Sequence, residues 1–312
     1  MNRNNFLKRI YTVMELRTGF ATGLPALSGG LFGAYLARDI KILPLVLMFI
    51  SGFSLNIVAN IANEIRAFLK NEENEDTFTG HLGSEGLVRG DAKFLDAIIA
   101  LGFMLALGGG SGLLVVLITK DISILIIGIL SALAAITYSL GPKPYIIYPI
   151  GELVSGIFAG GISSFVSSYI QQGKVSIEII LYALISMIMT VFLMSTNNTS
   201  DYEKDKGVRV TLPHVIGFRN SIKIIIPEAI IMILAWVILF LMSKISLIIF
   251  ISGLVIFYYY GYVKWYKDYY KIQEVYKEMG REWGPRPLLL IYSFHFIMSL
   301  EFLIYTVKCV AF

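Results

Sequence analysis

The chain alternates long apolar stretches with short polar connections, and this pattern predicts its secondary structure. Nine stretches are each long enough to cross a bilayer as a helix. They are Phe20–Ala37, Leu43–Ala62, Phe94–Thr119, Ile122–Leu140, Tyr145–Ile170, Ile177–Thr196, Ile224–Met242, Ile245–Val263 and Leu288–Val307. A backbone surrounded by lipid has to satisfy its own polar groups, which favours helices. We therefore predict an all-α integral membrane protein with nine transmembrane helices, in which residues 1–312 form a single domain.

The composition supports this prediction and indicates an orientation. Hydrophobic residues make up 56% of the chain and charged residues 15%, and the mean hydropathy is +0.71, which excludes a soluble globular protein. If the N-terminus is cytoplasmic, twenty of the 26 lysine and arginine residues fall on the inner side. This asymmetry predicts a cytoplasmic N-terminus and an outer C-terminus. Because the basic residues sort by side and form no single patch, the net charge of +4 does not indicate a nucleic-acid partner.

Three connections on the predicted inner side contain most of the polar and charged residues, namely Asn63–Lys93, Asn197–Lys223 and Lys264–Pro287. The outer connections are only a few residues long. We therefore expect the chemistry on the cytoplasmic face, with the inner loops covering a central cavity between the helices. The single cysteine, Cys309, excludes an internal disulfide framework. The three histidines, His81, His214 and His295, have no metal-ligand spacing and are predicted to be loop or packing residues.

An acidic segment directly follows the apolar stretch Ile177–Thr196. On a continuous helix Asn197, Asp201 and Asp205 share one face, because they are spaced by four residues. A charge carried into a bilayer costs about 2.5–3.5 kcal/mol, so acids at the end of a span favour a functional interpretation. Oxygen ligands without a soft partner suit Mg²⁺, which commonly bridges carboxylates to a substrate phosphate. The alternative is an ordinary solvated loop.

A second polar stripe occupies the end of another span, where Asn56, Asn60 and Glu64 recur at the same spacing with Asn63 beside them. This stripe indicates a polar, ligand-binding interior. In the alternative interpretation these amides only bond to neighbouring helices. Glu152, one turn inside another span, either contributes to the site or pairs with a cation.

Basic residues close to these stripes have a composition suited to binding a diphosphate. They are Arg66, Lys206, Arg209 and Arg219. Lys143 lies in a proline-bracketed turn, Tyr138–Tyr145, between two predicted spans. Its ammonium group either stabilises an anion or only sets the membrane topology.

Three segments carry a resemblance to the UbiA-type intramembrane prenyltransferases, and within them to the branch that acts on 1,4-dihydroxy-2-naphthoate in menaquinone synthesis. Asn197–Asp205, with Arg209 beyond it, is similar to the second aspartate-rich motif of that branch. The segment from Tyr138 to Leu153 is similar to its turn between the fourth and fifth helices. The segment Asn60–Glu64 is placed where the first aspartate-rich motif belongs.

The first motif departs from the family pattern. Where the family has Asn-Asp-x-x-Asp-x-x-x-Asp, this chain has Asn63-Glu64-x-x-Ala67-x-x-x-Asn71, which retains one carboxylate in register. The acids that follow, Glu72, Glu73, Glu75 and Asp76, are out of register.

The resemblance implies transfer of an isoprenyl chain from an allylic prenyl diphosphate to an aromatic or other lipophilic acceptor, with 1,4-dihydroxy-2-naphthoate as the first choice. It implies Mg²⁺ as cofactor and membrane lipid as surroundings. The implied metal ligands are Asp201, Asp205, Asn197, Glu64 and Asn60. The implied catalytic residues are Asp201, Asp205 and Lys143. The implied substrate-binding residues are Asn60, Asn63, Glu64, Arg66, Tyr138, Asn197, Asn198, Lys206 and Arg209.

Two alternatives stay open because the first motif is degenerate. One is a relative of these enzymes that acts on a different acceptor in specialised metabolism. The other is a catalytically impaired homologue that binds or transports lipid.

Overall fold

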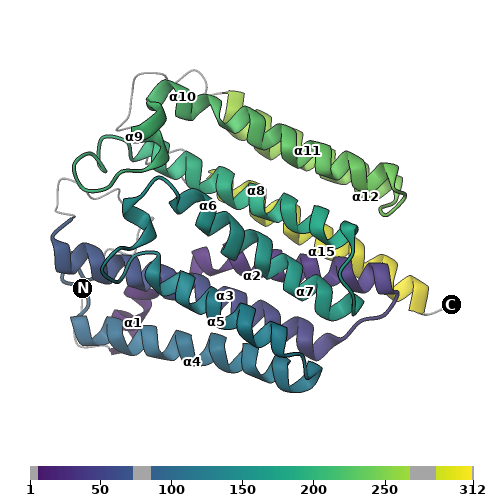
Figure 1. Cartoon of the computed structure of the whole chain (residues 1–312), viewed down its shortest axis with the longest axis horizontal. Coiled ribbons are helices and arrows are strands. Elements are labelled where there is room, and N and C mark those ends of the chain that lie inside the picture. Colours follow the sequence, from purple (N-terminus) through teal and green to yellow (C-terminus); the bar gives the residue numbers. More distant parts are fainter. Residues whose placement is uncertain (1–5, 73–85, 268–285, 311–312) are drawn as a thin grey trace.

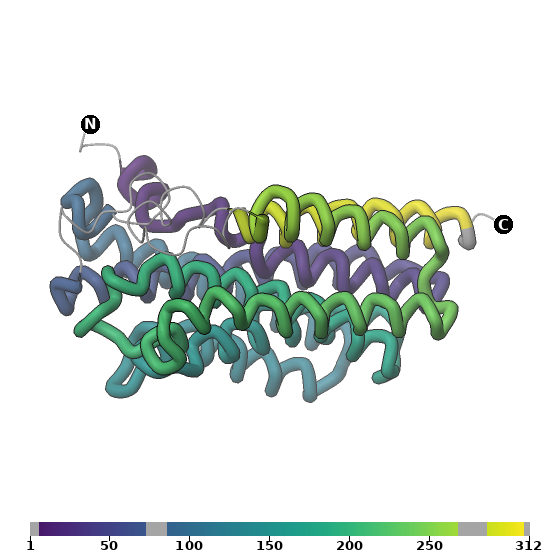
Figure 2. The backbone as a smooth tube through the Cα atoms, turned by 90° about the horizontal axis from the view of Figure 1, so that it is seen from above, coloured from purple at the N-terminus to yellow at the C-terminus, as the bar shows by residue number. Residues whose placement is uncertain are grey.

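The protein is a bundle of helices in a computed structural model that describes residues 6–72, 86–267 and 286–310. Within these ranges there is no β-strand. The helices run side by side along the long axis in both views, with the N-terminus near one end and the C-terminus at the other (Figures 1 and 2). The prediction of an all-α fold is therefore confirmed.

The helices follow the apolar pattern closely. In chain order they are α1 (Phe6–Met14), α2 (Leu16–Ala37), α3 (Ile42–Lys70), α4 (Phe94–Thr119), α5 (Ile122–Thr137), α6 (Gly151–Ser155), α7 (Ser163–Gln172), α8 (Ile177–Ser200), α9 (Leu212–Ile216), α10 (Phe218–Lys223), α11 (Ile225–Leu241), α12 (Leu247–Ile256) and α15 (Arg286–Val310). A π-helical stretch, Gly156–Ile162, joins α6 to α7, and another, Phe257–Tyr266, continues α12.

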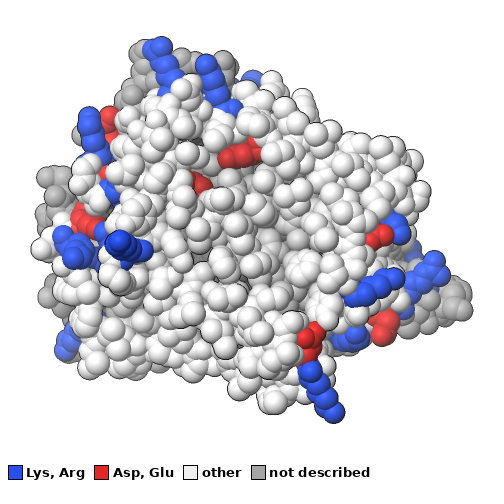
Figure 3. All heavy atoms as spheres, in the orientation of Figure 1, with Lys and Arg blue, Asp and Glu red and all other residues white. Residues whose placement is uncertain are grey.

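Eight helical segments in the described ranges are long and apolar enough to span a membrane. The remaining predicted span, Ile122–Leu140, corresponds to α5, which is apolar but shorter, at 16 residues. Charged side chains gather mainly at the two ends of the molecule, and a band with few charged side chains lies between them (Figure 3). This band includes outward-facing leucine and isoleucine side chains of α4 and α5. Such a surface is typical of a protein whose helices cross a membrane several times.

Two helices extend beyond their apolar stretches. The stretch that ends at Ala62 continues as α3 to Lys70, and the stretch that ends at Thr196 continues as α8 to Ser200. The first residues of two predicted inner loops are therefore helical. Asn63, inside α3, and Asn197, in the last turn of α8, are held by a helical backbone, which fixes their side chains more firmly than a loop does.

Close approaches between small residues set the helix positions around the central cavity. A Cβ atom on Gly33 of α2 would lie 2.3 Å from the backbone oxygen of Ser168 on α7. A Cβ atom on Gly160, in the π-helical stretch, would lie 2.2 Å from the backbone oxygen of Ser186 on α8. Small residues at these crossings let the backbones touch. They place α2, α7 and α8 around a common interior.

Candidate active site

A cavity of about 500 Å³ lies inside the bundle between α2, α3, α4, α5, α7 and α8. Most of its wall is apolar. One group of polar side chains comes from α3, from the last turn of α8 and from the segment after α8, and this group is called the polar end of the cavity below. It comprises Asn60, Asn63, Asn197, Asn198, Asp201 and Arg209. The two polar helix ends identified in the sequence therefore meet at one cavity.

The last turn of α8 presents two amides and one carboxylate to the polar end. Asn197 and Asn198 are helical, and Asp201 follows the last helical residue. The Asp201 backbone N–H donates to the carbonyl oxygen of Asn197 at 2.9 Å. The Ser200 hydroxyl donates to the same oxygen at 2.8 Å. These bonds close the helix end and hold Asp201 at the cavity wall.

Asp205 does not continue the helical face, and the predicted alignment of Asn197, Asp201 and Asp205 on one helix is wrong. Helix α8 ends at Ser200, and the segment from residue 201 to residue 211, here called the aspartate loop, follows. Single turns shape this loop, because the Asp205 N–H donates to the Asp201 carbonyl at 2.8 Å. Gly207, at φ 82°, adopts the left-handed conformation that glycine tolerates best.

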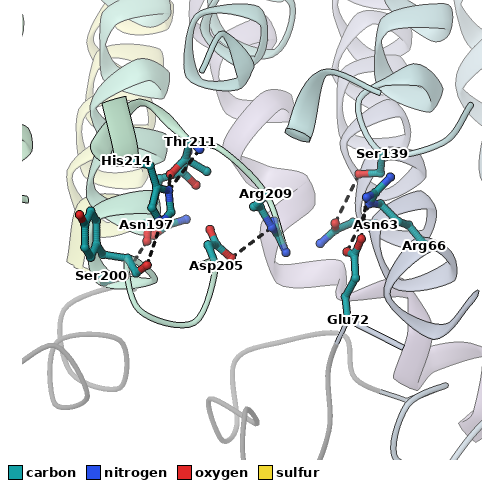
Figure 4. Close-up of polar contacts among 12 residues, drawn as sticks. Asn63, Arg66, Glu72, Ser139, Asn197, Ser200, Asp205, Arg209, Thr211 and His214 are labelled. Atoms are coloured by element: carbon teal, nitrogen blue, oxygen red, sulfur yellow. Dashed lines mark hydrogen bonds and ion pairs between the residues drawn. The ribbon is translucent and has the colours of Figure 1, made fainter. Parts of the chain in front are cut away.

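Asp205 and Arg209 form a buried ion pair inside the aspartate loop. Arg209 Nε lies 3.1 Å from Asp205 Oδ1, and their side chains are 13% and 3% exposed (Figure 4). Burial opposes the charge of Arg209, but Asp205, together with Tyr138, Glu72 and Asp201, holds the pKa of the guanidinium above its ordinary value. A fixed positive charge therefore stands at the polar end of the cavity.

His214 fastens the aspartate loop to the start of α9. Its Nδ1 lies 2.9 Å from the Thr211 hydroxyl, and its Nε2 lies 2.9 Å from the Tyr202 carbonyl oxygen. Its ring stacks on Tyr202 at a centroid distance of 4.7 Å. From the sequence, His214 was predicted to be only a loop or packing residue, and its spacing from other residues contains no signal for these contacts. His81 lies outside the described residues.

The amides on α3 line the cavity and also bond to α2. Asn60 Nδ2 donates to the Thr18 hydroxyl, and Asn56 Nδ2 donates to the Thr22 hydroxyl at 2.9 Å. Asn63 Oδ1 accepts a hydrogen bond from the Ser139 hydroxyl at 3.4 Å. The two interpretations of this stripe are therefore compatible, because the same amides join helices and face the cavity.

Glu64 points elsewhere. Its Oε1 accepts a hydrogen bond from the Leu87 backbone N–H at 2.5 Å, and its side chain is buried. Of the described residues, it is not among those that line the cavity. Asn60 and Asn63 therefore line the polar end of the cavity, whereas Glu64 does not.

Glu72 is a residue that the sequence pattern placed out of register. The chain reverses at Asn71, at φ 51°, and the Glu72 N–H donates back to the Ala67 carbonyl at 3.1 Å. The Glu72 carboxylate then meets Arg66 in two contacts, of 2.6 and 3.2 Å (Figure 4). Both side chains are largely buried. The next acids in the chain, Glu73, Glu75 and Asp76, lie outside the described residues.

The remaining predicted residues divide into two groups. Tyr138 lines the cavity. Lys143 and Lys206 are exposed, and within the described part of the chain neither lines the cavity. Lys206 lies 3.9 Å from Glu203, an exposed pair that contributes little. Arg66 lies one helical turn beyond Asn63.

The donor set at the polar end suits a hard cation. It offers the carboxylate of Asp201 and the amide oxygens of several asparagines, and Mg²⁺ prefers such oxygen ligands. Among the described residues no three acidic, histidine or cysteine side chains gather into a metal-binding group. The fit is therefore to a cation held by one or two carboxylates that completes its shell with water or phosphate.

A family model supports the same conclusion from the whole sequence. The model of the UbiA prenyltransferase family matches residues 23–279. This chain belongs to that family. The motif residues at the polar end, Asn197, Asp201 and Arg209, all lie inside the matched region.

Curated UbiA relatives include two bacterial 1,4-dihydroxy-2-naphthoate octaprenyltransferases. The chain is 27% identical to that of Bacillus subtilis over 208 residues, or 66% of this chain and 65% of the relative. It is 30% identical to that of Haemophilus influenzae over 182 residues, or 56% of this chain and 58% of the relative. The matches thus span about two thirds or less of each relative's length.

Solved UbiA structures share the fold. A UbiA homolog from Archaeoglobus fulgidus bound to DMAPP and Mg²⁺ superposes with a TM-score of 0.64 at 16% identity, covering 97% of this chain and 99% of that one. The apo UbiA homolog from Aeropyrum pernix K1 gives a TM-score of 0.64 at 14% identity, covering 87% and 96%. At these identities the likeness concerns the fold alone.

Proposed function

We propose that this protein transfers an isoprenyl chain from an allylic prenyl diphosphate to an aromatic acceptor, with 1,4-dihydroxy-2-naphthoate as the first candidate. The observation that supports this most is a cavity whose polar end is lined by residues of both α3 and α8. Its apolar remainder matches a prenyl chain, and its oxygen and guanidinium groups match a metal-bound diphosphate. Family membership and the named function of the curated relatives agree with it.

The residues that would hold Mg²⁺ are Asp201 and Asp205, with the amide oxygens of Asn197 and Asn60. When bound, Mg²⁺ would withdraw negative charge from the diphosphate and favour loss of the leaving group. Glu64, which accepts from a backbone N–H away from the cavity, has a structural role in this proposal. Asn63 and Asn198 contribute further oxygens to the same region.

Arg209 supplies the fixed positive charge that faces the leaving diphosphate. A preorganised charge in a poorly hydrated cavity stabilises developing negative charge more strongly than water does. Arg66, on α3 one helical turn beyond Asn63, is held by Glu72. Lys143 and Lys206 are exposed and, in the part of the chain that the structure describes, do not line the cavity. In this proposal they bind a phosphate only if their side chains extend toward the cavity from outside.

The apolar walls protect the reacting carbon. An allylic cation is consumed by water, and helices that exclude water leave it to the electron-rich carbon of the acceptor. We place the polar end on the cytoplasmic side, with the N-terminus inside and the C-terminus outside, because the basic residues concentrate on that side of the predicted topology.

The test is product mass spectrometry. Membranes containing the protein are incubated with Mg²⁺, a series of prenyl diphosphates and a series of aromatic acceptors. We expect a prenylated aromatic product from the wild type and none from Asp201→Asn. Asp39→Asn, which changes an exposed acid between α2 and α3, is the matched control and should retain activity. Unchanged turnover in Asp201→Asn contradicts the assignment.

A second candidate function rests on the degenerate first motif. Ala67 and Asn71 replace two acids, and Glu64 faces Leu87. A protein with fewer metal ligands is suited to binding a prenyl diphosphate or lipid without turning it over. This candidate gains if the wild type binds an allylic diphosphate but forms no product with any acceptor in the series.

A further inference from the structure

Glu152 contacts both ends of the aspartate loop. Its Oε1 accepts a hydrogen bond from Asn198 Nδ2 at 2.6 Å and another from the Leu212 backbone N–H at 3.2 Å. Asn198 lies in the last turn of α8, and Leu212 is the first residue of α9. One carboxylate oxygen at the start of α6 therefore accepts hydrogen bonds from the residues on both sides of the loop.

The surroundings of Glu152 favour holding the loop over binding a substrate. Its side chain is 3% exposed, and of the described residues it is not among those that line the cavity. Its second oxygen, Oε2, is buried and has no hydrogen-bond partner within the described part of the chain. A buried carboxyl group is costly unless it is hydrogen-bonded. The donors that offset this cost come from the two ends of the loop.

The contact with Asn198 also fixes the orientation of an amide at the cavity. A carboxylate oxygen accepts and does not donate, so the amide nitrogen of Asn198 faces Glu152. Asn198 itself lines the cavity. Without Glu152 the amide is free to rotate, and the polar end loses a defined acceptor.

We propose that Glu152 is a positioning residue that holds the aspartate loop, and with it Asp201, Asp205 and Arg209, in the arrangement that binds Mg²⁺ and diphosphate. This inference rests on the proposed prenyl transfer for its functional consequence. Its structural consequence is independent of that function, because the loop is tied by Glu152 whichever ligand the cavity takes.

The first test measures hydrogen–deuterium exchange in lipid nanodiscs, with peptides that cover residues 197–216. We expect Glu152→Ala to raise exchange across this segment, because the Leu212 N–H loses its acceptor and the Asn198 side chain at the end of α8 loses its partner. Glu152→Gln keeps a carbonyl oxygen in place and should exchange like the wild type. Unchanged exchange in Glu152→Ala overturns the proposal.

Two further variants make this test specific. Glu301→Ala is the matched control, because Glu301 on α15 is an acid that accepts from the Ser252 hydroxyl on α12 at 2.6 Å, and it should leave exchange in the aspartate loop unchanged. Asn198→Ala removes only one of the two contacts. It should loosen the end of α8 while the Leu212 amide stays protected, and this variant decides the question if Glu152→Ala does not fold. If Asn198→Ala also raises exchange at the Leu212 amide, the two hydrogen bonds of Glu152 do not act independently and the proposal is contradicted.

The second test measures the Mg²⁺ concentration for half-maximal prenyl transfer. Loss of a residue that orients metal ligands typically weakens metal affinity or activity by about 10–100-fold. We expect a shift of this order in Glu152→Ala and rescue in Glu152→Gln. If Glu152→Gln is as impaired as Glu152→Ala, the charge itself is required and the positioning role is wrong. If the wild type has no transferase activity, the proposed function fails while the exchange test still decides the role of Glu152.

Discussion

Asn60 on α3 and Asp201 at the end of α8 line the same end of one cavity, although most of the bundle separates them in the sequence. Asn60 is fixed by the Thr18 hydroxyl, and Asp201 by the closing turn of α8. Two polar segments that are distant in the sequence therefore line one site. It is the relationship on which the proposed diphosphate site depends.

Removing Arg209 should destabilise the protein through Asp205. Arg209→Ala removes the guanidinium that lies 3.1 Å from a 3% exposed carboxylate, and loss of one partner of a buried pair typically costs about 3–5 kcal/mol. We expect a lower unfolding midpoint in detergent for Arg209→Ala. Because the pair is broken in either case, the double variant with Asp205→Asn should be less destabilised than the sum of the two single variants. Full additivity would show that the two side chains are not coupled.

Changing Glu64 separates a structural role from a metal ligand. Glu64→Gln keeps an acceptor for the Leu87 N–H, so we expect normal activity and an unchanged Mg²⁺ requirement. Glu64→Ala leaves that buried donor without its acceptor and should cost about 1–3 kcal/mol of unfolding free energy. Thermal unfolding and a Mg²⁺ titration of turnover measure both effects. A large increase in the Mg²⁺ requirement of Glu64→Gln would instead identify Glu64 as a metal ligand.

Adding a methyl group at Gly33 should disturb the packing of α2 on α7. A Cβ atom there meets the Ser168 backbone oxygen at 2.3 Å, and overpacking of this kind costs about 1–3 kcal/mol. Gly33→Ala should therefore lower the unfolding midpoint. Gly128→Ala, on α5, is the control, because a Cβ atom at Gly128 has no neighbour within 4 Å. Equal stability of the two variants would refute the close packing of α2 on α7.

The membrane helices could be predicted from the sequence because lipid selects long apolar stretches. The ends of the helices could not be predicted in this way, because the hydropathy pattern marks only the part of a helix that lies in lipid. Helix α3 continues beyond its apolar stretch to Lys70, and α8 continues to Ser200. The placement of Asp205 was mistaken for a related reason. The spacing by four residues assumed a continuous helix, but Asp201, at φ −90° and ψ 12°, leaves the helical conformation and ends α8 first.

The polar end of the cavity was predicted in outline, because Asn60, Asn197 and Asp201 each lie at the end of a span. The contacts between different helices were not. Glu152 meets Asn198 and Leu212 only through the packing of α6 on α8, and no spacing in the sequence contains that information. Glu72 joins Arg66 because Asn71 reverses the chain, which a count of motif positions does not reveal.

The most direct test of the account is the Mg²⁺-dependent affinity for an unreactive prenyl thiolodiphosphate, measured for the wild type, Asn60→Ala, Asp201→Asn and the control Asp39→Asn. We predict that binding requires Mg²⁺, that both cavity variants weaken it by about 10-fold or more, and that the control binds like the wild type. Wild-type affinity in either Asn60→Ala or Asp201→Asn would contradict a diphosphate site shared by α3 and α8.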